Sequence, residues 1–193
     1  MAMPQQQRSE QSTSLTIGDK GGLKQLDYSD LVIYHQGDSW FGCSVGFRAM
    51  QVAQQAFPKS SPWTRENLYV ISAHPGPGVK DAINLVTQCV TRQCFRLLDE
   101  KVGEHCSRDM KFEWWVSHGE TAVHIKLHDD IVPDEFYCLL DRLNTEQEKP
   151  DDRQSFDAYK TDLSQQLWHQ TLDESFTIDI LPKRLKCGEL PNA

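Results

Sequence analysis

Apolar and polar positions follow two patterns along the chain, one typical of helices and one typical of strands. Apolar side chains recur every three or four residues in four stretches, which predict helices over residues 41–57, 79–92, a segment beginning at Pro133, and 152–172. Apolar residues that run together or alternate with polar ones predict strands over residues 67–73, 112–116, 122–127 and 176–181. Residues 26–34 fit either a helical turn or a strand.

These elements predict one α+β (mixed α/β) domain in which helices pack on a sheet. The strands at 112–116 and 122–127 are expected to form a hairpin. Residues 1–22 are polar and rich in Gly, Ser and Gln, so we expect them to be disordered. The domain is then expected to span residues 23–182, followed by a loose basic tail over 183–193.

Composition and charge narrow the class of protein. A chain of 193 residues can bury a core of its own, and a net charge of -8 argues against a nucleic-acid binder. No apolar run approaches the roughly 18 residues of a membrane span, and residues 1–10 lack the apolar stretch of a secretory signal. We therefore expect a cytoplasmic protein without membrane contact, whose six cysteines remain thiols.

The loop at residues 35–42 has the densest set of chemically active groups. His35, Asp38, Trp40 and Cys43 occur within nine positions, directly before or within the predicted helix 41–57. Ser39 is a candidate N-cap for that helix. A second candidate segment is the turn 74–78, which joins a predicted strand to a predicted helix. Its backbone N–H groups could bind an anion, although two prolines remove donors and favour a plain turn.

Two blocks of sequence resemble a family that is related to the E-subunit of formylmethanofuran dehydrogenase. Residues 30–42 and the following 46–49 are similar to the signature of this E-subunit-like family, which reads roughly aromatic-His-Gly-His-x-Cys-Pro-Gly and then Gly-x-Arg-Ala. Residues 80–83 and 87–89 resemble the family's Asp-Ala-Ile and Thr-Gly-Cys helix. The resemblance covers about residues 26–182. It implies a transition metal, usually zinc, held by the His and Cys residues of the loop.

The chain departs from this signature at the residues that would hold the metal. His35 matches the first family histidine, but Asp38 stands at the second one. Trp40 and Phe41 replace the Cys-Pro pair, and Gly78 stands at a further family cysteine. The implied metal site is therefore eroded or rebuilt from other ligands.

Two chemistries remain open at this loop. A rebuilt zinc site would draw on His35, Asp38, Cys43 and Cys89, with His74 as a further suitable ligand. The alternative for both cysteines is that they are small buried hydrophobes.

A metal-free pocket would instead use His35, Asp38 and His74 as acid–base groups. In that pocket Trp40 and Phe41 would form an apolar wall, unless they simply fill the space that the metal leaves. Arg48 and Lys80 are candidates for binding a substrate acid, and for Arg48 we favour an ion pair with a buried carboxylate.

Three functions follow from these alternatives. The first is a protein that binds or transforms a small organic molecule between the loop 35–42 and the turn 74–78. The second is a zinc-binding accessory protein of a redox enzyme, and the third is a non-catalytic interaction module.

Trp114 and Trp115 point to opposite faces of a strand, so at most one is expected in the core. The other could cover a helix or form the contact of a homodimer.

Overall fold

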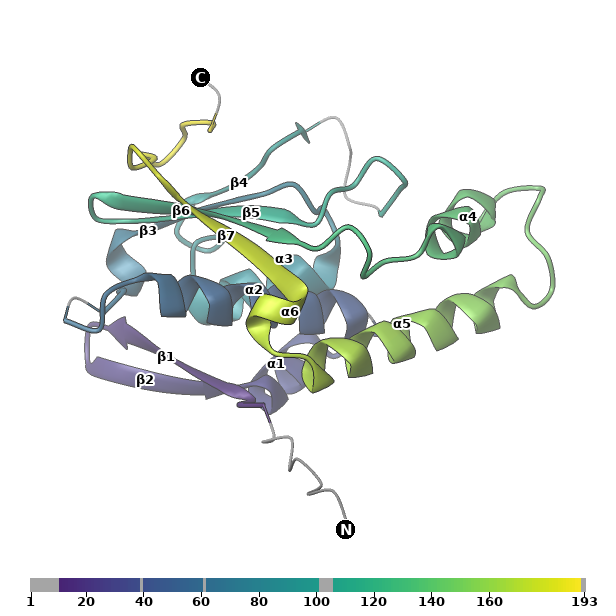
Figure 1. Cartoon of the computed structure of the whole chain (residues 1–193), viewed down its shortest axis with the longest axis horizontal. Coiled ribbons are helices and arrows are strands. Elements are labelled where there is room, and N and C mark those ends of the chain that lie inside the picture. The colour runs from purple at the N-terminus through teal and green to yellow at the C-terminus, as the bar shows by residue number, and fades with distance from the viewer. Residues whose placement is uncertain (1–10, 39, 61, 101–105, 192–193) are drawn as a thin grey trace, which may run out of the picture.

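Two sheets enclose a central layer of helices (Figure 1). The computed structural model describes residues 11–38, 40–60, 62–100 and 106–191. It confirms the predicted α+β fold with helices packed on a sheet. The helices of the described segments are α1 (Tyr28–His35), α2 (Trp40–Ala56), α3 (Pro77–Thr87), α4 (Asp134–Arg142), α5 (Asp152–His169) and α6 (Leu172–Ser175), with one 3-10 turn at Arg65–Asn67.

The larger sheet has five strands in the order β4-β3-β5-β6-β7. Only the pair β3–β4 is parallel, and the other neighbours are antiparallel. A separate hairpin is formed by β1 and β2. The strands are β1 (Ser14–Asp19), β2 (Gly22–Asp27), β3 (Leu68–Ser72), β4 (Phe95–Leu97), β5 (Glu113–His118), β6 (Thr121–Leu127) and β7 (Phe176–Leu181).

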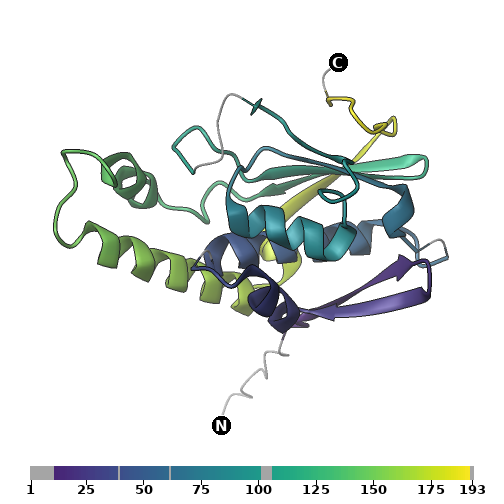
Figure 2. The same cartoon turned by 180° about the vertical axis from the view of Figure 1, so that it is seen from behind.

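Helix α2 is the centre of the fold because it is covered on several sides. The five-stranded sheet lies on one side of α2 and α3, and the β1–β2 hairpin lies on the other (Figures 1 and 2). Almost every residue of α2 from Phe41 to Ala53 is buried, as expected for a helix that is apolar around most of its circumference. Helices α4 and α5 extend beyond one end of the sheet, next to the first turn of α2 (Figure 1).

The hairpin corrects the predicted disorder of residues 1–22. Leu15 and Ile17 are buried against α2, and Trp63 Nε1 donates a hydrogen bond to the carbonyl of Thr16 at 2.7 Å. Residues 14–22 are therefore part of the domain, whereas residues 1–10 lie outside the described segments. Leu15 and Ile17 are two apolar positions in a polar stretch. This pattern is too short to predict a strand unless the partner strand is known.

The end of the chain also differs from the predicted loose tail. Arg184 forms an ion pair with Glu120 at 2.6 Å, and Tyr69 Oη donates to the carbonyl of Glu189 at 2.7 Å. Residues 183–191 thus cover the sheet face opposite α2. Trp115 is buried on that face and Trp114 on the α2 face, so the expectation that at most one is core was wrong. Their burial also removes the tryptophan contact suggested for a homodimer.

Other predicted elements agree within a few residues. The ambiguous segment 26–34 contains the end of β2 and most of α1, which begins after a capping box made by Asp27 and Asp30. Helix α3 ends at Thr87, earlier than predicted, because Gln88 adopts a left-handed conformation with φ of 56°. Strand β4 was not predicted, and Ser39 lies outside the described segments. Among the helices that the structure describes, none is long and apolar enough to cross a membrane.

Gly46 sets how closely α2 approaches α3. A Cβ atom at this position would lie 2.9 Å from Ala82 Cβ and 3.0 Å from Val79 Cα. The first distance is shorter than real Cβ contacts and the second is tighter than most, so a side chain would push the helices apart. We expect Gly46→Val to lower the free energy of unfolding by about 2 kcal/mol in urea titrations. Gly21→Ala, where nothing lies within 4 Å, is the control and should change stability little. Equal effects of the two substitutions would contradict this packing.

Candidate functional site

A cavity of about 650 Å³ opens where the first turns of α2 and α3 meet the pair α4 and α5. Its near wall comes from the loop before α2 and the turn before α3, and includes Asp38, Phe41, Gly42, His74, Gly76 and Gly78. Its far wall comes from the segment after residue 105 and from α4 and α5, and includes Cys106, Met110, Phe136, Leu140, Phe156 and Lys160. The two segments singled out from the sequence thus do meet at one cavity.

Aromatic contacts join the two walls. The ring of Phe41 lies 5.7 Å from that of Phe112 and 5.8 Å from that of Phe136, measured between centroids. Phe136 in turn lies 5.0 Å from Phe156 on α5. Phe41, Phe136 and Phe156 give the cavity an aromatic surface, and the ring contacts hold the projecting α4–α5 pair against the main domain.

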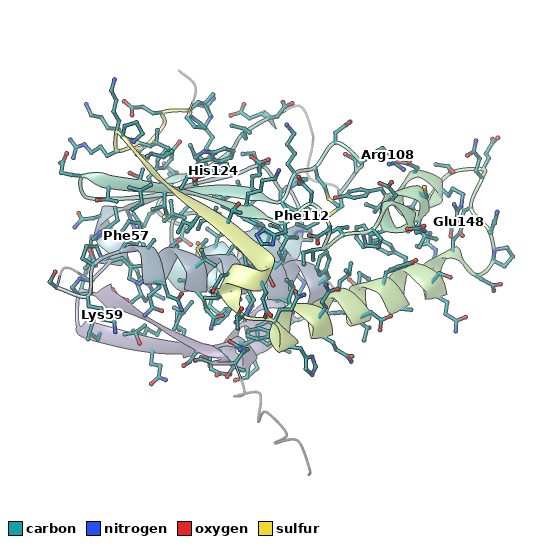
Figure 3. The ribbon with its side chains drawn as sticks, viewed as in Figure 1. Phe57, Lys59, Arg108, Phe112, His124 and Glu148 are labelled. Atoms are coloured by element: carbon teal, nitrogen blue, oxygen red, sulfur yellow. The ribbon has the colours of Figure 1, made fainter. Side chains whose placement is uncertain are left out.

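Ion pairs fix the far wall. Arg142 at the end of α4 binds the carboxylate of Asp152 through two nitrogens at 3.0 and 2.6 Å, and these bonds hold the pKa of Asp152 at about 2. Figure 3 shows Arg108 beside α4 and Glu148 in the connection to α5. Arg108 pairs with Asp141 on α4 at 2.7 Å, and Glu148 pairs with Arg153 on α5 at 2.7 Å. The first ion pair therefore joins α4 to α5, and the other two hold α4 to the segment that contains Arg108 and α5 to its preceding connection.

His74 is a buried, neutral histidine in the near wall. Its Nδ1 accepts the backbone N–H of Gly76 at 3.0 Å, and its ring packs 4.6 Å from that of Phe112. Burial lowers its pKa from 6.5 to about 3. The ring is therefore uncharged near neutral pH, which differs from the acid–base role predicted for it. Since Nδ1 is an acceptor, the single ring proton is on Nε2.

His35 pairs with Asp81 rather than with Asp38. Its Nδ1 lies 2.7 Å from Asp81 Oδ2, across the contact between α1 and α3. Its Nε2 is buried and has no hydrogen-bond partner among the described residues. A carboxylate that orients an imidazole in this way leaves the second nitrogen available as a base or a ligand. However, His35 does not line the cavity, so the structure does not unite it with His74 and Asp38 in one wall.

The two predicted cysteine ligands are buried core residues. Burial raises the pKa of Cys43 to about 12, with the nearby Asp81 carboxylate adding to the effect. Burial also raises the pKa of Cys89 to about 11, and its Sγ donates to the carbonyl of Leu68 at 3.3 Å. Both sulfurs stay protonated, as in the hydrophobic alternative. Across the described segments, no three His, Cys, Asp or Glu side chains are grouped so that they could hold a metal ion.

The predicted substrate-binding residues occupy different places. Phe41 lines the cavity, and Trp40 lies under the Lys160 ammonium, whose Nζ is 4.3 Å from its ring centroid. Arg48 is buried away from the cavity, where it donates to the carbonyl of Gln170 at 2.6 Å instead of pairing with a carboxylate. Burial lowers the pKa of Arg48 to about 10. Lys80 is exposed on α3 and does not line the cavity.

The sequence gives little indication that residues of α5 form the far wall of the cavity. Phe156 and Lys160 are four residues apart on α5, so both reach the cavity from one helix face. Lys160 Nζ is held by Asp157 Oδ1 at 2.9 Å and by the carbonyl of Asp38 at 3.3 Å. An aromatic residue followed by a lysine at this spacing is common on amphipathic helices, and only the fold shows that this face meets the loop 35–42.

Comparisons with known proteins add no identification. No family model matches the chain, and no curated protein matches it. The resemblance to the E-subunit-like family therefore stays a prediction.

The depressed pKa of His74 makes stability depend on pH. Below pH 6.5 the unfolded chain takes up a proton on this ring, but the folded protein does not until about pH 3. Stability is therefore lost as pH falls from 6.5 toward 3, by roughly 1 kcal/mol per pH unit. His74→Asn should flatten this dependence in urea titrations at several pH values. His169→Asn, which changes an exposed histidine of α5, should keep the original slope. The same pH dependence in the natural protein and both variants would refute the lowered pKa of His74.

Proposed function

We propose that this chain binds a small organic molecule in the cavity between the loop 35–42, the turn 74–78 and the α4–α5 pair. The observation that carries the proposal is the cavity itself. Its volume of about 650 Å³ lies within the range of natural ligand pockets, which is about 300–1,000 Å³. Like those pockets, it combines an apolar and aromatic lining with a few polar groups.

The titratable groups favour binding over acid–base catalysis. His74 is neutral near physiological pH, because burial lowers its pKa to about 3. A general base usually has its pKa close to neutrality, and His74 does not meet this condition. If the ligand is also transformed, Asp38 and Asp157 are the remaining candidate bases, since both line the cavity.

Filling the cavity tests this proposal. Leu140 on α4 lines the far wall, so Leu140→Trp places an indole in the cavity. Saturation-transfer NMR with a library of small acids, amides, amines and alcohols should detect ligands for the natural protein and lose them in the variant. Leu23→Trp, at an exposed position of β2, is the matched control and should retain them. The proposal fails if the natural protein binds no member of the library, or if Leu140→Trp binds the same members equally well.

A zinc-binding accessory protein is the second candidate, and one observation favours it. The buried Nε2 of His35 has no partner among the described residues, and Asp81 orients the ring as a carboxylate orients the histidine of many metal sites. The fit is incomplete, because Cys43 and Cys89 are protonated core residues and the described side chains form no three-ligand group.

Metal analysis decides this second candidate. If His35 holds zinc, protein purified without chelator should retain it when measured by ICP-MS, and His35→Gln should release it. His128→Gln changes another histidine and should have no effect. Absence of retained metal from the natural protein would eliminate the candidate and leave the cavity proposal untouched.

A further inference from the structure

The near wall of the cavity contains a hydrogen-bond donor that no described residue uses. The donor belongs to His74, which is 4% exposed and lines the cavity. Its Nδ1 accepts the N–H of Gly76, so Nε2 carries the ring proton. Among the described residues, none accepts a hydrogen bond from Nε2. Because His74 lines the cavity, its Nε2–H is a donor that a ligand oxygen there could use.

Two helices begin at the same cavity. The first residues of α2, which has 17 residues, and of α3, which has 11, both line it. The first N–H groups of a helix lack partners within the helix and carry partial positive charge. Pro77 occupies the first position of α3, where the N–H that proline lacks would have no partner within the helix in any case. Gly78 follows it with a free N–H and no side chain. Both helix starts therefore favour a negatively charged ligand group.

Lys160 adds a full positive charge to the far wall. Its side chain is only 12% exposed, and it is held over the ring of Trp40 and against the backbone carbonyl of Asp38. The other charged groups at the cavity are Asp38, Asp157 and Arg153, and all three residues are exposed. Asp157 pairs with Lys160, and Arg153 pairs with Glu148. Lys160 is thus the least exposed of the four charged residues at the cavity.

We infer that the cavity binds a small organic acid with an apolar body. Its carboxylate would accept hydrogen bonds from His74 Nε2 and from the free N–H groups at the start of α3, with Lys160 as the countercharge. Its apolar part would lie against the aromatic side chains of Phe41 and Phe156. This inference rests on the proposed function and adds the class of ligand to it.

A set of probes with one body and different charges tests the ligand class. Phenylacetate, phenylacetamide and 2-phenylethylamine share an aromatic ring and differ in their polar end, and acetate lacks the ring. By isothermal titration at low salt, phenylacetate should bind at least about tenfold more tightly than each of the other three.

Two substitutions locate the binding. Lys160→Met keeps the apolar stem but removes the charge, and should weaken phenylacetate about tenfold while changing phenylacetamide little. His74→Asn keeps an acceptor near the N–H of Gly76 but removes the Nε2 donor, and should weaken both compounds. Lys126→Met, which removes an exposed lysine paired with Asp129, is the control and should change neither affinity.

Three results would contradict the inference, and each can be told apart from the others. Equal or tighter binding of the amide or amine would show that the cavity does not select acids, while the proposed function stands. Phenylacetate binding that neither substitution at Lys160 nor at His74 alters would place the acid elsewhere. Failure of all four probes to bind at about 10 mM would also reject the inference, and the cavity-filling experiment then judges the proposed function separately.

Discussion

The burial of α2 on several sides determines how the other elements can be arranged around it. Gly46 lets α2 lie against α3 without a side chain between them, so the two helices run close together under the sheet. Their first turns therefore arrive at the same place, and the loop 35–42 and the turn 74–78 form one wall. Without this close approach the two polar segments would have no shared site.

The same burial determines the chemistry of that wall. The turn 74–78 places His74 where water cannot reach most of the ring, and the N–H of Gly76 occupies Nδ1. A histidine held in this way is a fixed hydrogen-bond donor rather than a proton shuttle. Cys43 and Cys89 show the same effect, because burial raises the pKa of both thiols. The residues that suggested a metal site in the sequence are thus distributed between core and cavity.

Elements with a strong local pattern could be predicted from the sequence. The helix α2 and the β5–β6 hairpin follow from apolar spacing alone, because each buries a regular face. The hairpin β1–β2 and strand β4 could not be found in this way, since their stability depends on partners distant in sequence. The loop 35–42 and the turn 74–78 were expected to lie together, and residues of both line the cavity. The pairing of His35 with Asp81 and the contribution of Lys160 were not expected, because both depend on how separate helices pack.

The ring of His74 must present an Nε2–H donor to the cavity if an acid is to bind there. Long-range ¹H–¹⁵N correlation spectra of histidine-labelled protein measure this directly, because a protonated and an unprotonated ring nitrogen differ strongly in chemical shift. The structure predicts a protonated Nε2 and an unprotonated Nδ1 for His74, unchanged between about pH 5 and about pH 8. A ring that becomes an imidazolium in this interval, or one that carries its proton on Nδ1, would overturn the assignment of His74 as a fixed donor.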